Sequence, residues 1–246
     1  MDEAGRAGRP SLVVGLVDLL LPGGCAGCGG GAGTRLRSGV CEPCIRTVGR
    51  LRPGPTRPDP APDGMPVCVA LGDYDGVLRE LVLAYKDRGR HRLGRPLGRL
   101  LSQAAATLVT DRVALVPVPD TPAAARSRHG DHLWRLARPA AAALRGAGLQ
   151  VVLARPLRAR PRPDSAGLGA AARAAHATAA LRVRPARAAG LRRWVERTGG
   201  AVVVLDDVVT TGATIASTTR RLAAEGVPVT GAAVLAATVR THPPAR

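Results

Sequence analysis

The chain has 246 residues and 46% of them are hydrophobic, but phenylalanine is absent and aromatic residues make up only 2%. This length allows one large domain or a medium domain with an appendage, and the core must be built from alanine, valine and leucine. The formal net charge is +18. It has two interpretations, a solvated basic surface shaped by coding bias or a surface that meets nucleic acid, and both predict weak affinity for polyanions such as DNA.

The first residues show no sign of a membrane span or of export. Residues 1–9 are expected to be disordered and residues 10–21 to form a short apolar helix. Residues 12–21 are about half as long as a span requires, and Asp18 interrupts them. No charged-then-apolar signal with a small-residue cleavage site is evident, so we expect a cytoplasmic protein.

Four of the five cysteines form two Cys-x-x-Cys pairs separated by twelve residues, namely Cys25, Cys28, Cys41 and Cys44. Tetrahedral zinc takes four soft ligands, and the glycine-rich stretch between the pairs cannot build a core of its own. The pairs therefore predict a structural zinc knuckle within an N-terminal unit, residues 1–51. Disulfides are the weaker alternative in a reducing compartment. Cys68 stands apart and is expected to pack as a small buried hydrophobe.

A segment rich in proline, arginine and aspartate, residues 52–66, is predicted to be a linker. Beyond it, residues 67–246 alternate strand and helix patterns. Strands are expected at 67–71, 113–118, 151–154, 201–205 and within 227–237, and helices at 76–87, 93–108, 132–144, 168–180 and 214–225. This alternation predicts an α/β domain with a mainly parallel sheet and helices on both faces.

The most informative motif follows the strand expected at 201–205. Asp206 and Asp207 are expected where this strand leaves the sheet, and a loop with Thr210, Thr211, Gly212, Ala213 and Thr214 comes next. Adjacent carboxylates can accept hydrogen bonds from sugar hydroxyls or help to hold a divalent cation. Gly212 lets the backbone approach a ligand, and the following helix points its free N–H groups at the same place. A strand–turn–helix joint with Asp and Thr as caps would explain only one or two of these residues.

This run, from Val203 to Thr214, resembles the PRPP-binding motif of type I phosphoribosyltransferases. The resemblance implies that Asp206 and Asp207 are the catalytic pair that binds the ribose hydroxyls. It also implies that residues 210–214 cradle the 5′-phosphate.

Further segments fit the same site. A strand ending in Pro117-Val118-Pro119-Asp120 enters a tight turn that could bring backbone N–H groups to a pyrophosphate. Two later segments supply arginines that suit a leaving group with several negative charges. The candidates on this pyrophosphate side are Lys86, Pro119, Asp120, Arg126, Arg128 and Arg173. Lys86 is the only lysine of the chain. The histidines His129, His132 and His176 are expected on the polar surface.

The layout as a whole, over residues 12–239, resembles the ComF family, phosphoribosyltransferase-like proteins with an N-terminal zinc knuckle, some of them linked to competence for DNA uptake. The chain departs from that family on the leaving-group side, where His129 and Gly130 stand in reversed order and Ser165 and His176 replace the usual amides. The resemblance implies an Mg²⁺-dependent phosphoribosyltransferase acting on PRPP and an unknown acceptor. The alternative is a non-catalytic module that senses PRPP or a nucleotide and engages DNA or a competence partner through the zinc knuckle and the basic surface.

Overall fold

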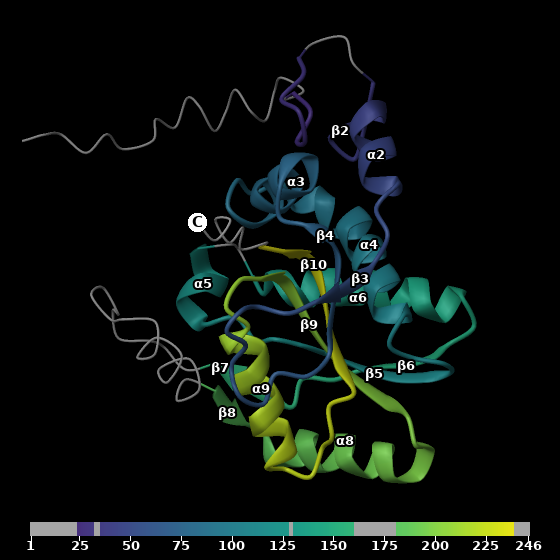
Figure 1. The fold of residues 1–246 in the computed structure, drawn as a ribbon, viewed down its shortest axis with the longest axis vertical. Helices are drawn as coiled ribbons and strands as arrows, with labels where there is room; N and C mark the ends of the chain where they lie inside the picture. Colours follow the sequence, from purple (N-terminus) through teal and green to yellow (C-terminus); the bar gives the residue numbers. More distant parts are fainter. Residues whose placement is uncertain (1–23, 32–34, 128–129, 160–180, 239–246) are drawn as a thin grey trace, which may run out of the picture.

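Six strands form the central sheet in the computed structural model, which describes residues 24–31, 35–127, 130–159 and 181–238. Their order is β3 (Gly54–Thr56), β4 (Cys68–Asp73), β10 (Gly231–Ala237), β9 (Ala201–Val209), β5 (Arg112–Pro117) and β6 (Gln150–Leu153). Strands β4, β10, β9, β5 and β6 run parallel, and β3 pairs antiparallel with β4 (Figure 1). The predicted α/β class with a mainly parallel sheet is confirmed.

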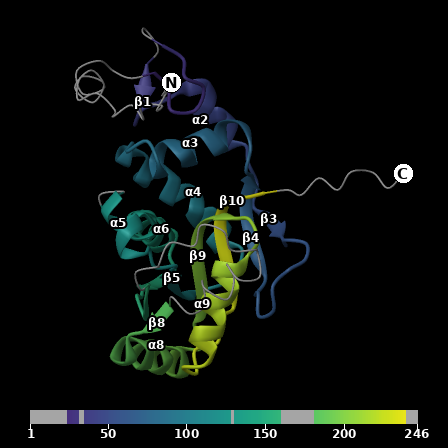
Figure 2. The same ribbon diagram turned by 90° about the vertical axis from the view of Figure 1, so that its left-hand side faces the viewer.

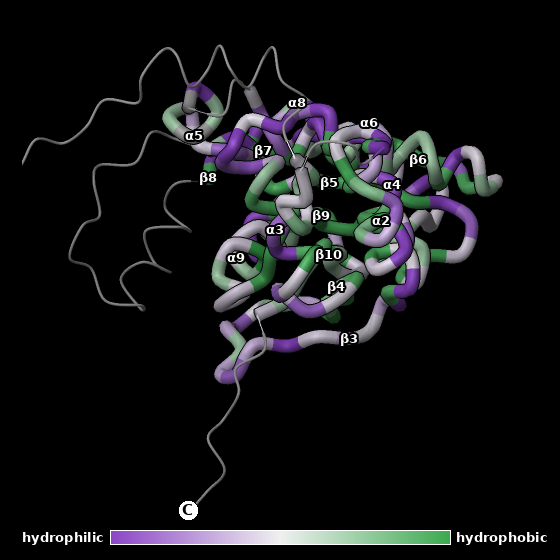
Figure 3. The backbone as a smooth tube through the Cα atoms, turned by 90° about the horizontal axis from the view of Figure 1, so that it is seen from above, coloured by the Kyte–Doolittle hydropathy of each residue, from purple (hydrophilic) through white to green (hydrophobic). Residues whose placement is uncertain are grey.

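Aliphatic side chains make the core, as the absence of phenylalanine requires. Residues 202–205 of β9 are fully buried, and every residue of β10 is buried. A strand buried on both faces is a continuous apolar run, because no face of it meets water. The tube view shows this pattern, with apolar segments of β5, β9 and β10 lying inside and hydrophilic segments such as those of α8 lying outside (Figure 3).

Helices cover the sheet. On one face α4 (Gly94–Ala106) packs against β4 and β10, and α6 (His132–Gly146) packs against β5 and β9. These two helices cross closely at Gly98, where an added Cβ would stand 2.5 Å from the carbonyl oxygen of Leu136. On the opposite face of the sheet, β9 contacts α9 (Ala213–Ala223) (Figure 2). Both faces of β9 can contact a helix because successive side chains of a strand point to opposite faces.

The predicted strands and helices recur with small shifts in α3 (Gly76–Lys86), α4, α6, α9 and the five parallel strands. The strand at 201–205 is four residues longer than expected, because β10 continues to pair with β9 as far as Val209. The 52–66 segment, expected to be only a linker, contains β3. Proline is tolerated in β3 because the strand lies at the edge of the sheet.

Several elements were not foreseen. They are α8 (Pro185–Thr198), α5 (Pro122–Ser127), the 3₁₀ turn η1 (His91–Leu93) and the small hairpin of β7 (Leu157–Ala159) and β8 (Leu181–Val183). For α8 the signals were present, since Pro185 stands in its first turn and Gly199 ends it in the left-handed conformation. The helices expected at 10–21 and 168–180 lie outside the described residues.

The N-terminal unit lies above α3 (Figure 2). It holds the hairpin of β1 (Leu36–Arg37) and β2 (Val40–Cys41), followed by α2 (Glu42–Gly49). The guanidinium of Arg90, which follows α3, donates to the carbonyl oxygen of Gly24 at 2.7 Å and ties this unit to the sheet domain. In the part of the chain that the structure describes, no helix has both the length and the apolar character needed to cross a membrane.

Candidate functional site

The β9 loop, Thr210–Thr214, joins the end of β9 to the first turn of α9. Thr210 and Thr211 are exposed and Thr214 is half-buried. Gly212 precedes α9 with a φ of 71°, and an added Cβ there would stand 2.6 Å from the sulfur of Met65. Both observations explain why glycine occupies this position. The loop lines a small hollow of about 30 Å³ at the N-terminus of α9, where the helix dipole and the first backbone N–H groups of the helix favour an anion.

The two adjacent aspartates of the motif point to opposite faces of β9. Asp206 is half-buried and lines the hollow of the β9 loop together with Thr210 and Thr214. Asp207 lies on the other face, toward α6 and the end of α3, and only 4% of it is exposed. The two carboxylates therefore occupy different environments, whereas the sequence motif alone treats them as a pair.

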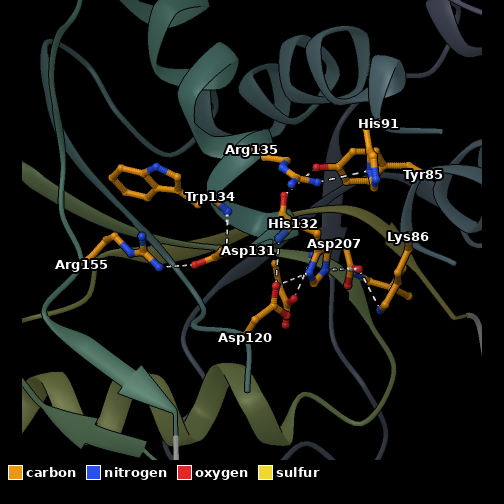
Figure 4. Close-up of polar contacts among 12 residues, drawn as sticks. Tyr85, Lys86, His91, Asp120, Asp131, His132, Trp134, Arg135, Arg155 and Asp207 are labelled. Carbon is orange, nitrogen blue, oxygen red and sulfur yellow. Dashed lines mark hydrogen bonds and ion pairs between the residues drawn. The ribbon is translucent and has the colours of Figure 1, made fainter. Parts of the chain in front are cut away.

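Asp207 belongs to a chain of ionisable groups, the His132 network, formed by the half-buried Lys86 and by the more deeply buried side chains of Asp120, His132 and Asp207 (Figure 4). The Nε2 atom of His132 lies 3.0 Å from Oδ2 of Asp207, and the Nζ atom of Lys86 lies 2.8 Å from the same oxygen. On its other side, Nδ1 of His132 lies 2.6 Å from Oδ2 of Asp120. The backbone N–H of Val208 donates to the second oxygen of Asp207 at 2.8 Å. Both oxygens of Asp207 thus have protein partners.

The His132 network links segments that are far apart in the sequence. Asp120 follows β5, His132 begins α6 and Asp207 stands near the end of β9. The backbone N–H of His132 also donates to Asp120 at 2.9 Å, and the hydroxyl of Tyr85 donates to the carbonyl oxygen of His132 at 2.7 Å. One imidazole therefore holds the turn after β5 against the strand that carries the β9 loop.

The pKa values follow from these contacts. Burial alone would lower the pKa of His132, but its hydrogen bonds with Asp120 and Asp207 and their charges raise it to about 9. Burial would raise the pKa of Asp207, yet the hydrogen bond to His132 and the charges of Lys86 and His132 hold it well below its usual range. Burial and the neighbouring charge of Asp207 raise the pKa of Asp206 to about 7. At neutral pH the network contains charged His132 and charged Asp207.

The structure brings together only some residues of the predicted pyrophosphate side. Lys86 and Asp120 both belong to the His132 network, and Pro119 lies in the turn just before Asp120. Arg126 is exposed on α5. Arg128 and Arg173 lie outside the described residues, as do His129 and His176.

The expectation that His132 lies on the polar surface is wrong, since only 6% of it is exposed. A signal for its burial existed. His132 begins the buried stripe of α6 that continues every fourth residue through Leu136, Ala140 and Leu144. A histidine at a stripe position faces the core, and there it needs charged or polar partners.

The four paired cysteines converge at the N-terminal unit, and their sulfur atoms all lie within 4.8 Å of one another. The Sγ atoms of Cys28 and Cys41 stand 3.7 Å apart. Sulfurs bound tetrahedrally to one zinc at about 2.3 Å would be about 3.8 Å apart. The cluster of Cys25, Cys28, Cys41 and Cys44, called here the cysteine knuckle, could therefore hold a metal such as zinc.

Within the cysteine knuckle the hydrogen bonds of Cys25 favour a thiolate, whereas burial raises the pKa of Cys44. The backbone N–H groups of Gly27 and Cys41 donate to the sulfur of Cys25 at 3.3 and 3.2 Å. Burial would raise the pKa of Cys25, but these and further N–H groups lower it to about 6. A thiol that ionises near neutral pH is a ready metal ligand. Cys68 differs from this group, since it is buried as expected, and burial with the nearby charge of Asp206 raises its pKa to about 12.

A scan against protein-family models and a search of curated proteins find no match to this chain.

Proposed function

We propose that the chain binds PRPP or a related phosphoribosyl ligand at the β9 loop, as a phosphoribosyltransferase-like protein of the ComF type. The observation that carries the proposal is the hollow at the N-terminus of α9, lined by Asp206 and by the threonines of the loop. A terminal phosphate there would meet backbone N–H groups and hydroxyl donors, as anions do at helix N-termini. Asp206, half-buried beside it, would accept hydrogen bonds from ribose hydroxyls.

The two aspartates take different parts in this proposal. Asp206 would contact the ligand, because it lines the hollow. Asp207 would act as a positioning residue, because His132, Lys86 and Val208 already occupy its oxygens. The Mg²⁺ that accompanies PRPP would be held largely by the phosphates of the ligand, which is the usual manner of binding for this ion. Mg²⁺-dependent transfer of phosphoribose to an acceptor is the reaction that such binding would serve.

Isothermal titration calorimetry with PRPP and Mg²⁺ tests the proposal on a matched pair of variants, Asp206→Asn and Asp207→Asn. The wild-type chain is expected to bind PRPP. Asp206→Asn should weaken binding by about tenfold or more, since a charged hydrogen-bond acceptor is lost, while the melting temperature holds or rises. Asp207→Asn should instead lower the melting temperature. Absence of PRPP binding by the wild-type chain would refute the proposal, and pyrophosphate release with a panel of nucleobases would test transfer.

A further inference from the structure

Two cavities lie away from the β9 loop and share one residue, Trp134. The first, of about 710 Å³, runs between α4 and α6, and each helix contributes two arginines to it: Arg95, Arg99, Arg135 and Arg138. The second, of about 560 Å³, lies between β6 and α8 and is lined by Arg155, Arg187, Arg197 and Trp194. The two cavities together are called the Trp134 surface below.

The Trp134 surface is more basic than the chain as a whole. The chain has twice as many basic as acidic residues, 36 against 18. Seven arginines line the two cavities, and among the described residues that line them there is no aspartate or glutamate. Arg155 is paired with Asp131, but Arg95, Arg99, Arg138, Arg187 and Arg197 are exposed.

Arg184 does not line the second cavity, but the charges of two arginines that do line it act on its guanidinium. The pKa of Arg184, just before α8, is lowered by burial and further by the charges of Arg187, Arg155 and Arg158. Like charges held this close raise the free energy of the unliganded surface, and a bound anion would relieve the repulsion.

Aromatic side chains stand among these arginines. Trp134 and Trp194 are the only tryptophans of the chain, and both line the second cavity. Both are half-buried, and the guanidinium of Arg155 lies 4.7 Å from the centre of the Trp134 ring (Figure 4). Arginines beside partly exposed aromatic rings are a combination that binds single strands, because phosphates pair with the cations while bases stack on the rings.

We propose that the Trp134 surface binds single-stranded DNA or RNA. A duplex keeps its bases stacked inside and would leave the tryptophans without a partner. A phosphorylated protein segment would use the arginines but not the rings. The cysteine knuckle is not part of this surface, and neither is any residue of the β9 loop, so the proposal stands independently of PRPP binding.

The test is a titration of tryptophan fluorescence with single-stranded oligothymidylate of about 20 nucleotides, longer than the usual site of roughly 4–16. Because both tryptophans line the surface, binding there should quench their emission. Arg99→Ala/Arg138→Ala, one change on each wall of the first cavity, should weaken binding about tenfold. It should also reduce the slope of log affinity against log salt by about 1.4, or roughly 0.7 for each lost phosphate contact.

The matched control is Arg50→Ala/Arg57→Ala, which removes the same charge from exposed positions flanking β3, at the opposite edge of the sheet from β6. Its affinity should stay within about twofold of the wild-type value. Equal weakening by both double variants would show bulk charge alone and overturn the proposal. Binding that survives Arg99→Ala/Arg138→Ala but is lost in Cys25→Ser would move the site to the cysteine knuckle. A duplex of equal length that binds and quenches as well as the single strand would also overturn it, as would equal quenching by a phosphoserine peptide.

Discussion

The cysteine knuckle and the His132 network both bury ionisable groups, but they satisfy them in different ways. In the knuckle, four cysteines from one short stretch of chain converge on a point that a metal could occupy. In the network, two carboxylates from different strand ends are bridged by one imidazole, and a lysine pairs with one of them, Asp207. The knuckle could take an added cation, whereas the network carries its own, so we expect each to fail under a different treatment.

Metal removal should have the largest effect, and only on the knuckle. A structural zinc site in a small unit supplies on the order of 10–16 kcal/mol of apparent binding free energy at neutral pH, much of it folding free energy. Chelation should therefore abolish protection of the amides in residues 24–50 in hydrogen exchange, while the amides of β9 and β10 keep theirs. Metal analysis should find one zinc per chain in the wild type.

Two cysteine variants sharpen this result. Cys44→Ser should lose the zinc, whereas Cys68→Ala should retain it, because Cys68 is buried in the sheet and lies outside the cluster. Equal zinc content in the wild type and in Cys44→Ser would contradict the assignment of the four ligands.

The next largest effect is expected at the centre of the network. His132→Leu fills the space of the imidazole with an apolar side chain. It leaves the buried carboxylates of Asp120 and Asp207 with one cation fewer. Breaking a buried ion pair in this way costs about 3–5 kcal/mol of unfolding free energy. Urea denaturation would measure the loss.

Lys86→Met is the matched control for this variant. The side chain of Lys86 is 27% exposed in the wild type, so water can replace part of the interaction with Asp207 that the variant loses. A cost of about 1 kcal/mol is expected. If both variants cost the same, the imidazole would not be the central member of the network.

These two regions also differ in how far the sequence predicts them. The cysteine knuckle could be predicted because its ligands form two local pairs whose spacing is visible in the chain. The partners of His132 lie 12 and 75 residues away, at Asp120 and Asp207, and only the packing of α6 on β9 brings them together. The opposite directions of Asp206 and Asp207 depend on a β9 that continues through both residues, and it does so because β10 is long enough to pair with it. The motif points to a candidate site that stays a prediction, and it does not indicate that its two carboxylates face different environments.

The network should also make stability depend on pH. A histidine whose folded pKa is raised from about 6.5 to about 9 stabilises the fold fully below pH 6.5 and loses this contribution as the pH rises through 9. The loss is on the order of 3 kcal/mol. Asp206, whose pKa is raised to about 7, acts in the same direction at lower pH, since its ionisation in the folded chain disfavours folding. Urea denaturation at pH 6, 7, 8 and 9 should show that the stability advantage of the wild type over His132→Gln falls as the pH rises above 7. The lowered pKa of Cys25 acts in the opposite direction over this range, but it is common to both chains. An advantage that stays constant or grows with pH would contradict the charged state of His132.

The smallest effect is expected from two glycine variants that test the geometry of the β9 loop. The two glycines share a backbone conformation but differ in what an added Cβ would meet. Gly212 and Gly199 both have a left-handed φ, at 71° and 63°, but an added Cβ meets the sulfur of Met65 at Gly212 and nothing within 4 Å at Gly199. Gly199→Ala should therefore cost only the left-handed strain, about 1 kcal/mol, while Gly212→Ala adds the displacement of Met65 and should cost about 2 kcal/mol. Thermal unfolding would measure both. Gly212 directly precedes α9 beside the hollow, so only Gly212→Ala, and not Gly199→Ala, should weaken the binding of a phosphate ligand. Equal costs at the two sites would mean that Met65 moves freely, and the β9 loop would then be less tightly held against its neighbours than these contacts require.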